Sequence, residues 1–278
     1  KEIQMAVTKA KKAEVAVVVV GSNSLRHKWD EKTCGENADR ASLGLYGRQL
    51  ELVQKVHATG TPTIVVLING RPLAIDWCAK NIPSIIEAWE PGLYGGLAIA
   101  ETLFGKNNPS GKLTVSFPSS VGQIPCFYNH KPSAYFRSYV DEETKVLFPF
   151  GHGLSYTTFQ YHNLDIPEEI EIGEPLQVSV NLVNTGNYDG SETVIIYVND
   201  KYSRYTTPVK EMKAFKKVFL RKGEEKTIQF ILKPEQLSIL NENMKRQVEP
   251  GLFEIMVADQ KKEVEVFTRN AAHHWQKL

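Results

Sequence analysis

The chain has 278 residues and a mass of 31.3 kDa, which is long for one domain and sufficient for two. Hydrophobic residues make up 42%, and 33 lysines and arginines nearly balance 32 aspartates and glutamates. These proportions exclude a largely disordered chain, and a formal charge of +1 gives no general attraction to nucleic acid or to an anionic membrane. The longest strongly apolar stretch, residues 15–20, is far shorter than the roughly 20 residues of a membrane-spanning helix.

In the first part of the chain, short apolar runs alternate with helix-like segments. Residues 15–20 are β-branched or small, stop at Gly21 and suit a strand buried on both faces. A helical period over 49–57 is followed by a second apolar run over 63–68. Further candidates are a strand at 84–89 and a helix at 96–103. This order predicts an α/β domain over residues 1–127, with a mostly parallel sheet and helices on both faces (an α/β sandwich).

The second part of the chain has a different pattern. Residues 128–154 are irregular and rich in aromatic side chains, so we expect a connector packed on a surface. From residue 155 the apolar positions recur with a period of two, most clearly at 176–182, 193–198, 227–232 and 253–257. Short strands at regular spacing predict an antiparallel, immunoglobulin-like β-sandwich over 155–278.

The most promising loop for binding or catalysis spans residues 21–40, because ligands of open α/β sheets bind beyond the carboxyl ends of the strands. Within it, Glu36 could be a general acid or base if burial raised its pKa, although a loop carboxylate is more often simply solvated. Asp39 and Arg40 could orient sugar hydroxyls or hold the loop together by an ion pair. Trp29 could stack on a pyranose ring or plug the loop with its ring.

Other site classes have little support. The loop after the first strand lacks the glycine patterns of dinucleotide and phosphate binding, and the chain has no G-x-S-x-G nucleophile elbow. The spacing of the three cysteines is too wide for a zinc site, and an odd number cannot all form disulfides within the chain. This favours free thiols at Cys34, Cys78 and Cys126. We therefore expect no metal and no cofactor.

Six segments, taken in order, resemble the C-terminal half of family 3 of the glycoside hydrolases, the β-glucosidase and β-xylosidase family. A match to any single segment would be weak evidence for the family, but matches to six segments in order over residues 35–159 are highly specific. Residues after about 160 are similar to the fibronectin type III-like domain that follows in many members. The segments are GENADRASL (35–43), VLINGRPL (66–73), AWEPGLYGG (88–96), LFGKNNPSGKL (103–113), GQIP (122–125) and FPFGHGLSYTTF (148–159).

The resemblance implies a retaining, exo-acting β-glycosidase that acts on β-linked oligosaccharides or glycosides. In the family an aspartate nucleophile comes from a preceding (β/α)8 barrel, and Glu36 matches the acid/base glutamate of the following domain. No barrel precedes residue 1, so we expect one from a missing segment or a partner chain. Locally, Asn37 stands where many members carry glycine, and Cys34 where serine is frequent.

Tyr139 and Asp141, in the aromatic connector, either border the sugar site or pack within the connector. The family also implies a periplasmic or secreted location. The competing hypothesis is a non-catalytic module that contacts carbohydrate or serves assembly when the chain is alone. The sugar, the linkage and the oligomeric state do not follow from the sequence.

Overall fold

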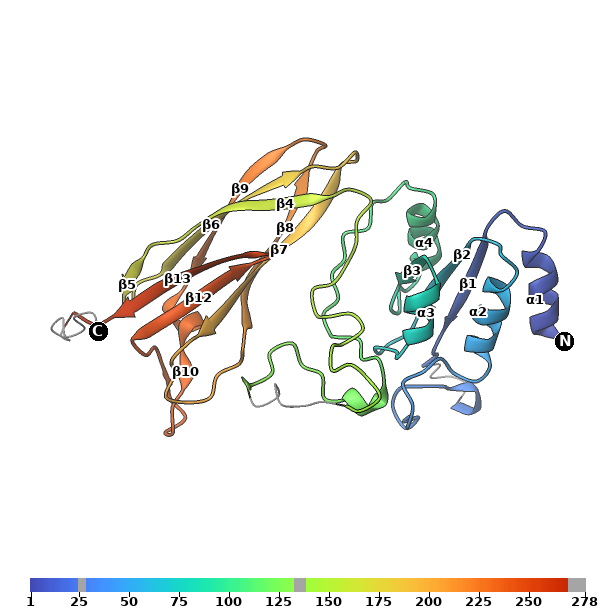
Figure 1. The fold of residues 1–278 in the computed structure, drawn as a ribbon, viewed down its shortest axis with the longest axis horizontal. Coiled ribbons are helices and arrows are strands. Elements are labelled where there is room, and N and C mark those ends of the chain that lie inside the picture. Colours follow the sequence, from blue (N-terminus) through green and yellow to red (C-terminus); the bar gives the residue numbers. More distant parts are fainter. Residues whose placement is uncertain (25–28, 133–138, 270–278) are drawn as a thin grey trace. The chain divides into compact units, whose positions relative to one another are not determined.

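The computed structural model describes residues 1–24, 29–132 and 139–269 (Figure 1). The chain divides into two compact units. The first comprises residues 1–107, 113–126 and 138–152, and the second comprises 108–112, 127–137 and 153–278. The domain limits predicted at residues 127 and 154 stay a prediction.

The first unit contains a three-stranded parallel sheet in the order β1-β2-β3, as its alternating pattern predicts. Each strand is followed by loops and helices, which return the chain so that the next strand runs in the same direction. No helix of the described residues has the length and hydrophobicity to cross a membrane. The elements are α1 (Glu2–Ala10), β1 (Ala16–Gly21), α2 (Gln49–His57), β2 (Thr63–Ile68), α3 (Asp76–Asn81), β3 (Ser84–Glu87) and α4 (Gly95–Leu103).

Strand β1 is buried on one face only. Val18 and Val20 belong to a core that also contains Val53 and Val56 of α2. The alternate residues are exposed, Val17 by 47% and Val19 by 57%. The expectation that this strand is buried on both faces is therefore wrong for this chain, because an all-valine run carries no period that shows which face is covered.

The parallel strands end where the binding loops begin. At Gly21, the last residue of β1, φ is +145°, and a Cβ atom would lie 1.9 Å from the carbonyl oxygen of Ile68 at the end of β2. Only glycine allows the two backbones to approach this closely. Ser22 then donates its N–H to the same Ile68 oxygen at 2.9 Å, which extends the pairing into the loop.

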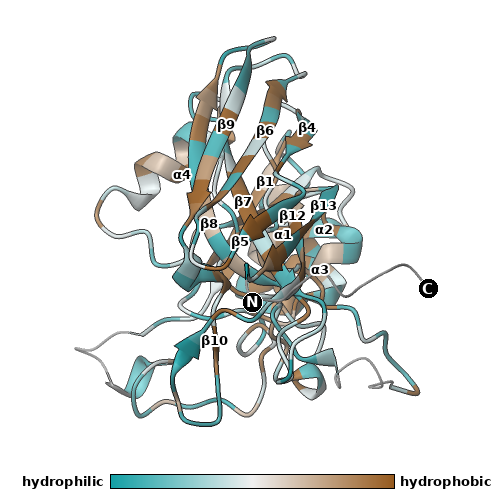
Figure 2. Cartoon of the chain, turned by 90° about the vertical axis from the view of Figure 1, so that its left-hand side faces the viewer, coloured by the Kyte–Doolittle hydropathy of each residue, from teal (hydrophilic) through white to brown (hydrophobic). Residues whose placement is uncertain are grey.

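The second unit is a β-sandwich, as predicted. A five-stranded sheet has the order β5-β13-β12-β7-β8 and is antiparallel except for the β13–β5 pair; β4, β6 and β9 form the other sheet. Hydrophobic and hydrophilic residues alternate along β6 and β9 (Figure 2). The strands are β4 (Phe159–Asp165), β5 (Glu169–Glu171), β6 (Leu176–Asn184), β7 (Gly190–Asp200), β8 (Glu211–Leu220), β9 (Glu225–Leu232), β12 (Gly251–Val257) and β13 (Gln260–Phe267).

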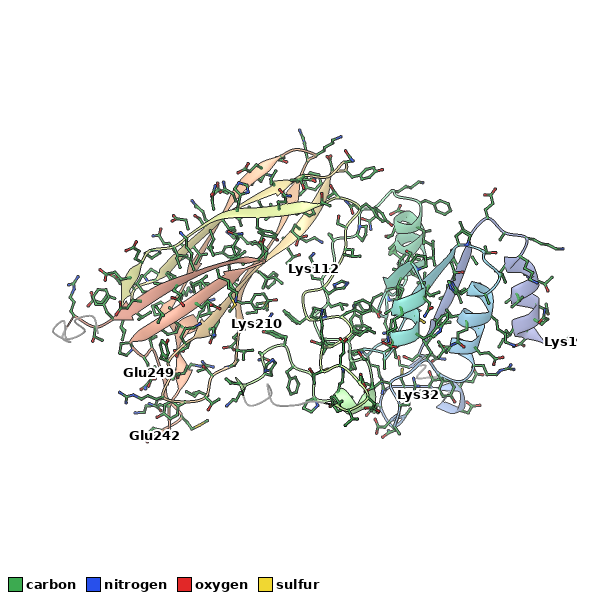
Figure 3. The ribbon with its side chains drawn as sticks, in the orientation of Figure 1. Lys1, Lys32, Lys112, Lys210, Glu242 and Glu249 are labelled. Carbon is green, nitrogen blue, oxygen red and sulfur yellow. The ribbon has the colours of Figure 1, made fainter. Side chains whose placement is uncertain are left out.

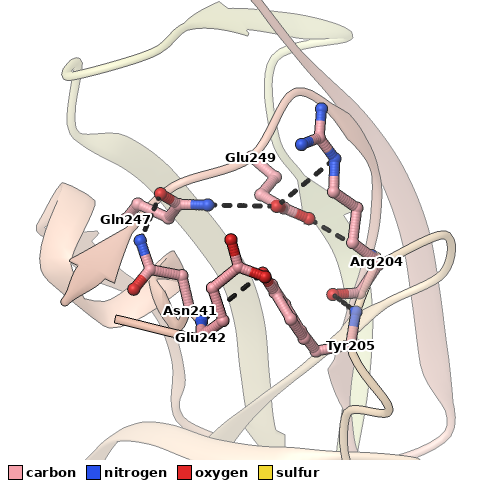
Figure 4. Close-up of polar contacts among 7 residues, drawn as sticks. Arg204, Tyr205, Asn241, Glu242, Gln247 and Glu249 are labelled. Atoms are coloured by element: carbon pink, nitrogen blue, oxygen red, sulfur yellow. Dashed lines mark hydrogen bonds and ion pairs between the residues drawn. The ribbon is translucent and has the colours of Figure 1, made fainter. Parts of the chain in front are cut away.

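A polar network ties the loop between β7 and β8 to the small hairpin of β10 (Ile239–Leu240) and β11 (Arg246–Gln247) (Figure 4). Glu249 is only 9% exposed and accepts hydrogen bonds from the Arg204 N–H at 3.2 Å and from Gln247 Nε2 at 3.1 Å. Each buried carboxylate oxygen thus has a donor, so the network stabilises this end of the sandwich.

Candidate functional site

The loop after β1 folds back on itself. Asn23 accepts hydrogen bonds at its carbonyl oxygen from the N–H groups of Thr33 (3.0 Å) and Cys34 (3.2 Å), and its own N–H donates to Thr33 Oγ1 at 2.8 Å. Cys34 is buried, with 2% exposure. These contacts fix the residues directly before Glu36 to the end of a core strand, so the loop is built on the rigid part of the domain.

Glu36 occupies the corner of a tight turn. The Ala38 N–H donates to the Gly35 carbonyl oxygen at 2.9 Å, and Asn37 has φ of +59° at the third position, as a type II turn requires. Asparagine is one of the few residues other than glycine that adopt this conformation readily. Lys32 Nζ donates to the Glu36 carbonyl oxygen, and the Glu36 side chain is exposed. Figure 3 labels Lys32 on this loop.

A second carboxylate, Glu87, shapes the end of β3. Its Oε1 accepts the Trp89 N–H at 2.8 Å, and its Oε2 accepts Asn69 Nδ2 at 3.3 Å. Asn69 is fully buried at the end of β2 and donates its N–H to the Trp89 carbonyl oxygen at 3.1 Å. Burial raises the pKa of Glu87 to about 7, against the lowering effect of the two hydrogen bonds. Trp89 is held in the left-handed region, with φ of +54°.

The loops after the three strands meet at Glu90. Ser24 Oγ, in the loop after β1, donates to Glu90 Oε1 at 2.8 Å. Gly70, after β2, leaves room for this carboxylate, since a Cβ atom there would lie 3.2 Å from Oε1. The sequence analysis did not single out Ser24, Asn69, Glu87 or Glu90. Their place at the carboxyl ends of three predicted parallel strands was the available signal.

The other residues of this loop that were predicted as site residues are Asp39, Arg40 and Trp29, and each has its own surroundings. Asp39 is exposed. Arg40 Nη2 donates to the Gly44 carbonyl oxygen at 2.8 Å, and its guanidinium carbon lies 5.4 Å from the centre of the Tyr46 ring. These contacts hold the loop. The backbone of Trp29 begins a short 3₁₀ turn, but its side chain lies outside the described part of the structure.

The two candidates of the connector belong to another set of contacts. Tyr139 donates its hydroxyl to the Gly122 carbonyl oxygen at 2.5 Å and is 38% exposed. Gln123, in the same 3₁₀ turn, donates from Nε2 to the Glu143 carbonyl oxygen at 2.8 Å. Asp141 is exposed. The connector is thus bonded to the 3₁₀ turn Val121–Gln123, and a role for Tyr139 or Asp141 at a sugar site stays a prediction.

Among residues 1–24, 29–132 and 139–269, no group of three or more His, Cys, Asp or Glu side chains is arranged to hold a metal ion. The three cysteines are free thiols, and burial raises the pKa of Cys78 to about 11, which keeps it protonated and unreactive. What the edge offers chemically is a solvent-accessible carboxyl group, Glu36, on a fixed turn. Retaining glycoside hydrolysis needs two carboxyl groups about 5–5.5 Å apart, and Glu36 could supply one.

The chain thus combines a parallel α/β domain, with an acidic loop at its carboxyl edge, and a β-sandwich. Residues 1–156 match the glycosyl hydrolase family 3 C-terminal domain, and residues 192–261 match a fibronectin type III-like domain. The chain belongs to glycoside hydrolase family 3.

Relatives with named activities support this assignment. The chain is 46% identical to a β-xylosidase of Formosa agariphila over 91% of its length, and 39% identical to a periplasmic β-glucosidase of Salmonella typhimurium over 92%. It superposes on a β-glucosidase of Erythrobacter marinus with a TM-score of 0.89 and 38% identity, covering 95% of this chain and 36% of that one. The chain spans 34% of the length of both named relatives, about a third.

Proposed function

We propose that this chain provides the general acid/base of a retaining, exo-acting β-glycosidase that hydrolyses terminal β-glucosides or β-xylosides. The observation that carries the proposal is Glu36, whose carboxyl group is exposed at the corner of a fixed turn, at the carboxyl edge of a parallel sheet. The substrate class is supported by the names of the relatives, which are β-glucosidases and β-xylosidases.

In the first step of this mechanism, protonated Glu36 donates its proton to the glycosidic oxygen while a carboxylate nucleophile attacks the anomeric carbon. The leaving group departs as an alcohol, and a glycosyl ester remains on the nucleophile. In the second step, the Glu36 carboxylate takes a proton from water, and that water displaces the nucleophile to release the sugar. The nucleophile belongs to a barrel domain, supplied by a preceding segment or by a partner chain.

Asp39 is the first choice for contact with the sugar hydroxyls, since it is exposed on the same loop as Glu36. Trp29, Arg40, Tyr139 and Asp141 are further candidates for the substrate site. In this proposal the protein is exported to the periplasm or beyond, supported by the periplasmic relative. Cell fractionation of the source organism tests this location.

The test uses the full-length protein with Glu36→Ala and aryl β-glycosides of different leaving-group pKa. We expect kcat/KM to collapse for poor leaving groups and to change little for dinitrophenyl glycosides, which depart without a proton. Azide should restore turnover of the dinitrophenyl substrate by forming a β-glycosyl azide. Glu14→Ala, an exposed carboxylate on the loop before β1, is the control. A Glu36→Ala enzyme with normal rates on poor leaving groups and no azide effect would overturn the assignment.

A second candidate is a catalytically silent module that contacts carbohydrate or serves assembly. The sequence of this chain alone leaves this alternative open, and the chain spans 34% of the length of the two curated relatives. The purified chain, checked for folding by circular dichroism, is expected to show no turnover of aryl β-glucosides. Measurable turnover would contradict our assignment of the nucleophile to another domain.

A further inference from the structure

Among the described residues, the carboxyl group of Glu36 makes no hydrogen bond or ion pair, and Glu36 is held in place through its neighbours. Gly35, the residue before it, lies against Ser24, and a Cβ atom at Gly35 would be 3.3 Å from the Ser24 Cβ. Ser24 is two residues beyond the last β1–β2 pairing at Ser22, and its hydroxyl donates to Glu90 Oε1 at 2.8 Å. The Ser24 side chain thus lies directly beside the turn that carries Glu36, together with the Lys32 side chain.

The Glu90 end of this contact is fixed independently of the Glu36 loop. Trp89, just before it, donates its N–H to the Glu87 carboxylate at 2.8 Å and has φ of +54°. The ring of Trp89 packs edge-on against Phe117, with 5.9 Å between ring centres. Because these contacts fix both the backbone and the ring of Trp89, the core determines the direction of the chain at Glu90.

We infer that Glu90 is a positioning residue for the acid/base: its carboxylate holds the Ser24 hydroxyl, and Ser24 in turn supports Gly35 and the turn at Glu36. The inference rests on the proposed function of Glu36. Proton donation depends on the distance between donor and glycosidic oxygen, and a misplacement of about 1 Å can cost roughly a hundredfold in rate. Loss of the Ser24–Glu90 contact therefore impairs proton donation while the nucleophile and the sugar contacts of the other domain remain.

The test measures kcat/KM of the full-length protein on two β-glycosides, one alkyl or disaccharide substrate and one dinitrophenyl substrate. Glu90→Ala and Ser24→Ala should each lower kcat/KM by about ten- to a hundredfold for the first substrate and by less than about threefold for the second. The double variant should lose no more than either single one. Glu90→Gln keeps an acceptor oxygen for Ser24 and should retain most of the activity, and Glu14→Ala is the control.

The ratio of the two kcat/KM values, measured on one preparation, does not depend on the folded fraction, so partial unfolding cannot imitate the effect. Equal losses on both substrates, or no loss on either, would overturn the positioning role. Glu36→Ala separates this failure from that of the proposed function. If Glu36→Ala shows the leaving-group dependence and azide rescue while Glu90→Ala shows neither loss nor dependence, only the role of Glu90 fails.

Discussion

Lys112 and Glu192 form a nearly buried ion pair within the second unit, although 80 residues of sequence separate them. Lys112 Nζ lies 3.1 Å from Glu192 Oε1, and the two side chains are 18% and 11% exposed. Lys112 also donates to the Gly153 carbonyl oxygen at 2.9 Å, and Glu192 Oε1 accepts the Tyr161 hydroxyl at 3.2 Å. The pair anchors residues 108–112 in the sandwich unit, so this segment belongs to the β-sandwich by contact rather than by position in the sequence.

Removing one partner of this pair should destabilise the sandwich unit strongly. Lys112→Met leaves the Glu192 carboxylate largely desolvated and without its cation, with the Tyr161 hydroxyl as a remaining donor, which costs about 3–5 kcal/mol. Urea denaturation followed by circular dichroism measures the change. Lys261→Met is the control, because Lys261 is 61% exposed in its pair with Glu254 and should cost less than about 0.5 kcal/mol. Equal midpoints for the two variants would show that the pair adds nothing to stability.

Asn184 at the end of β6 should be equally sensitive. Its side chain is fully buried and satisfied: Oδ1 accepts the Thr157 hydroxyl at 2.6 Å and the Gly186 N–H at 3.2 Å, and Nδ2 donates to the Tyr188 carbonyl oxygen at 2.8 Å. Asn184→Ala leaves these groups without partners, and we expect a loss of about 2–4 kcal/mol in the free energy of unfolding.

The matched control for Asn184 is Asn181→Ala in the same strand, where the side chain is partly exposed, donates to Glu225 Oε1 at 2.8 Å and accepts the Thr227 hydroxyl at 3.1 Å. Because water replaces those bonds, the control should cost less than about 1 kcal/mol. Differential scanning calorimetry distinguishes the two variants. An Asn184→Ala protein as stable as Asn181→Ala would mean that the buried network is not needed.

Elements with a strong local period were predictable from the sequence. The helix predicted at 49–57 is α2 (Gln49–His57), and the run at 63–68 is β2 (Thr63–Ile68). Strands β8 and β13 were not predicted. In β8 the exposed residues include Phe215 and Phe219, so hydrophobicity does not follow burial, and in β13 lysines and glutamates hide the alternation. In β13 only Val264 and Val266 are buried, which is too short a pattern to indicate a strand of eight residues.

For the candidate site, relationships between residues close in the sequence were predictable, whereas contacts between residues far apart in the sequence were not. Glu36 was predicted from the segment that surrounds it, and that prediction stays untested; its environment in the loop follows from neighbours in the sequence. The contact between Ser24 and Glu90 joins residues 66 apart, and it depends on the order β1-β2-β3, which the sequence alone does not specify. Likewise, the raised pKa of Glu87 comes from burial, a property of the packed domain.

The stability of the first unit should depend on the ionisation of Glu87. Its pKa of about 7 in the folded state lies above the ordinary value of 4.5, so between these values the folded state binds more protons than the unfolded state. The contribution of Glu87 to the free energy of unfolding is therefore largest below about pH 4.5. It falls as the pH rises towards 7 and then levels off, with a total loss of at most about 3 kcal/mol.

Glu87→Gln removes this dependence, because the amide stays neutral. The difference in unfolding free energy between Glu87→Gln and the parent protein should grow in favour of the variant between pH 5 and pH 8, measured by urea denaturation. Glu51→Gln is the control: Arg48 lowers the pKa of Glu51 to about 2, so its ionisation does not change in this range. A difference for Glu87→Gln that stays constant from pH 5 to pH 8 would contradict the assigned pKa.

The junction between β1 and the loop that carries Glu36 should tolerate no side chain at Gly21. In Gly21→Ala the new Cβ atom would lie 1.9 Å from the Ile68 carbonyl oxygen and 2.7 Å from its carbon, so the ends of β1 and β2 must separate. We expect a loss of more than about 3 kcal/mol, beyond the roughly 1–2 kcal/mol of left-handed strain alone. Gly60→Ala isolates that strain, because Gly60 has φ of +81° and open space around it. The melting temperatures of the two variants, measured by thermal unfolding, compare the two costs. Because Ser22 and Ser24 follow this junction directly, the full-length protein with Gly21→Ala should also lose activity on poor leaving groups. Similar melting temperatures for both variants would show that the sheet end can open without cost.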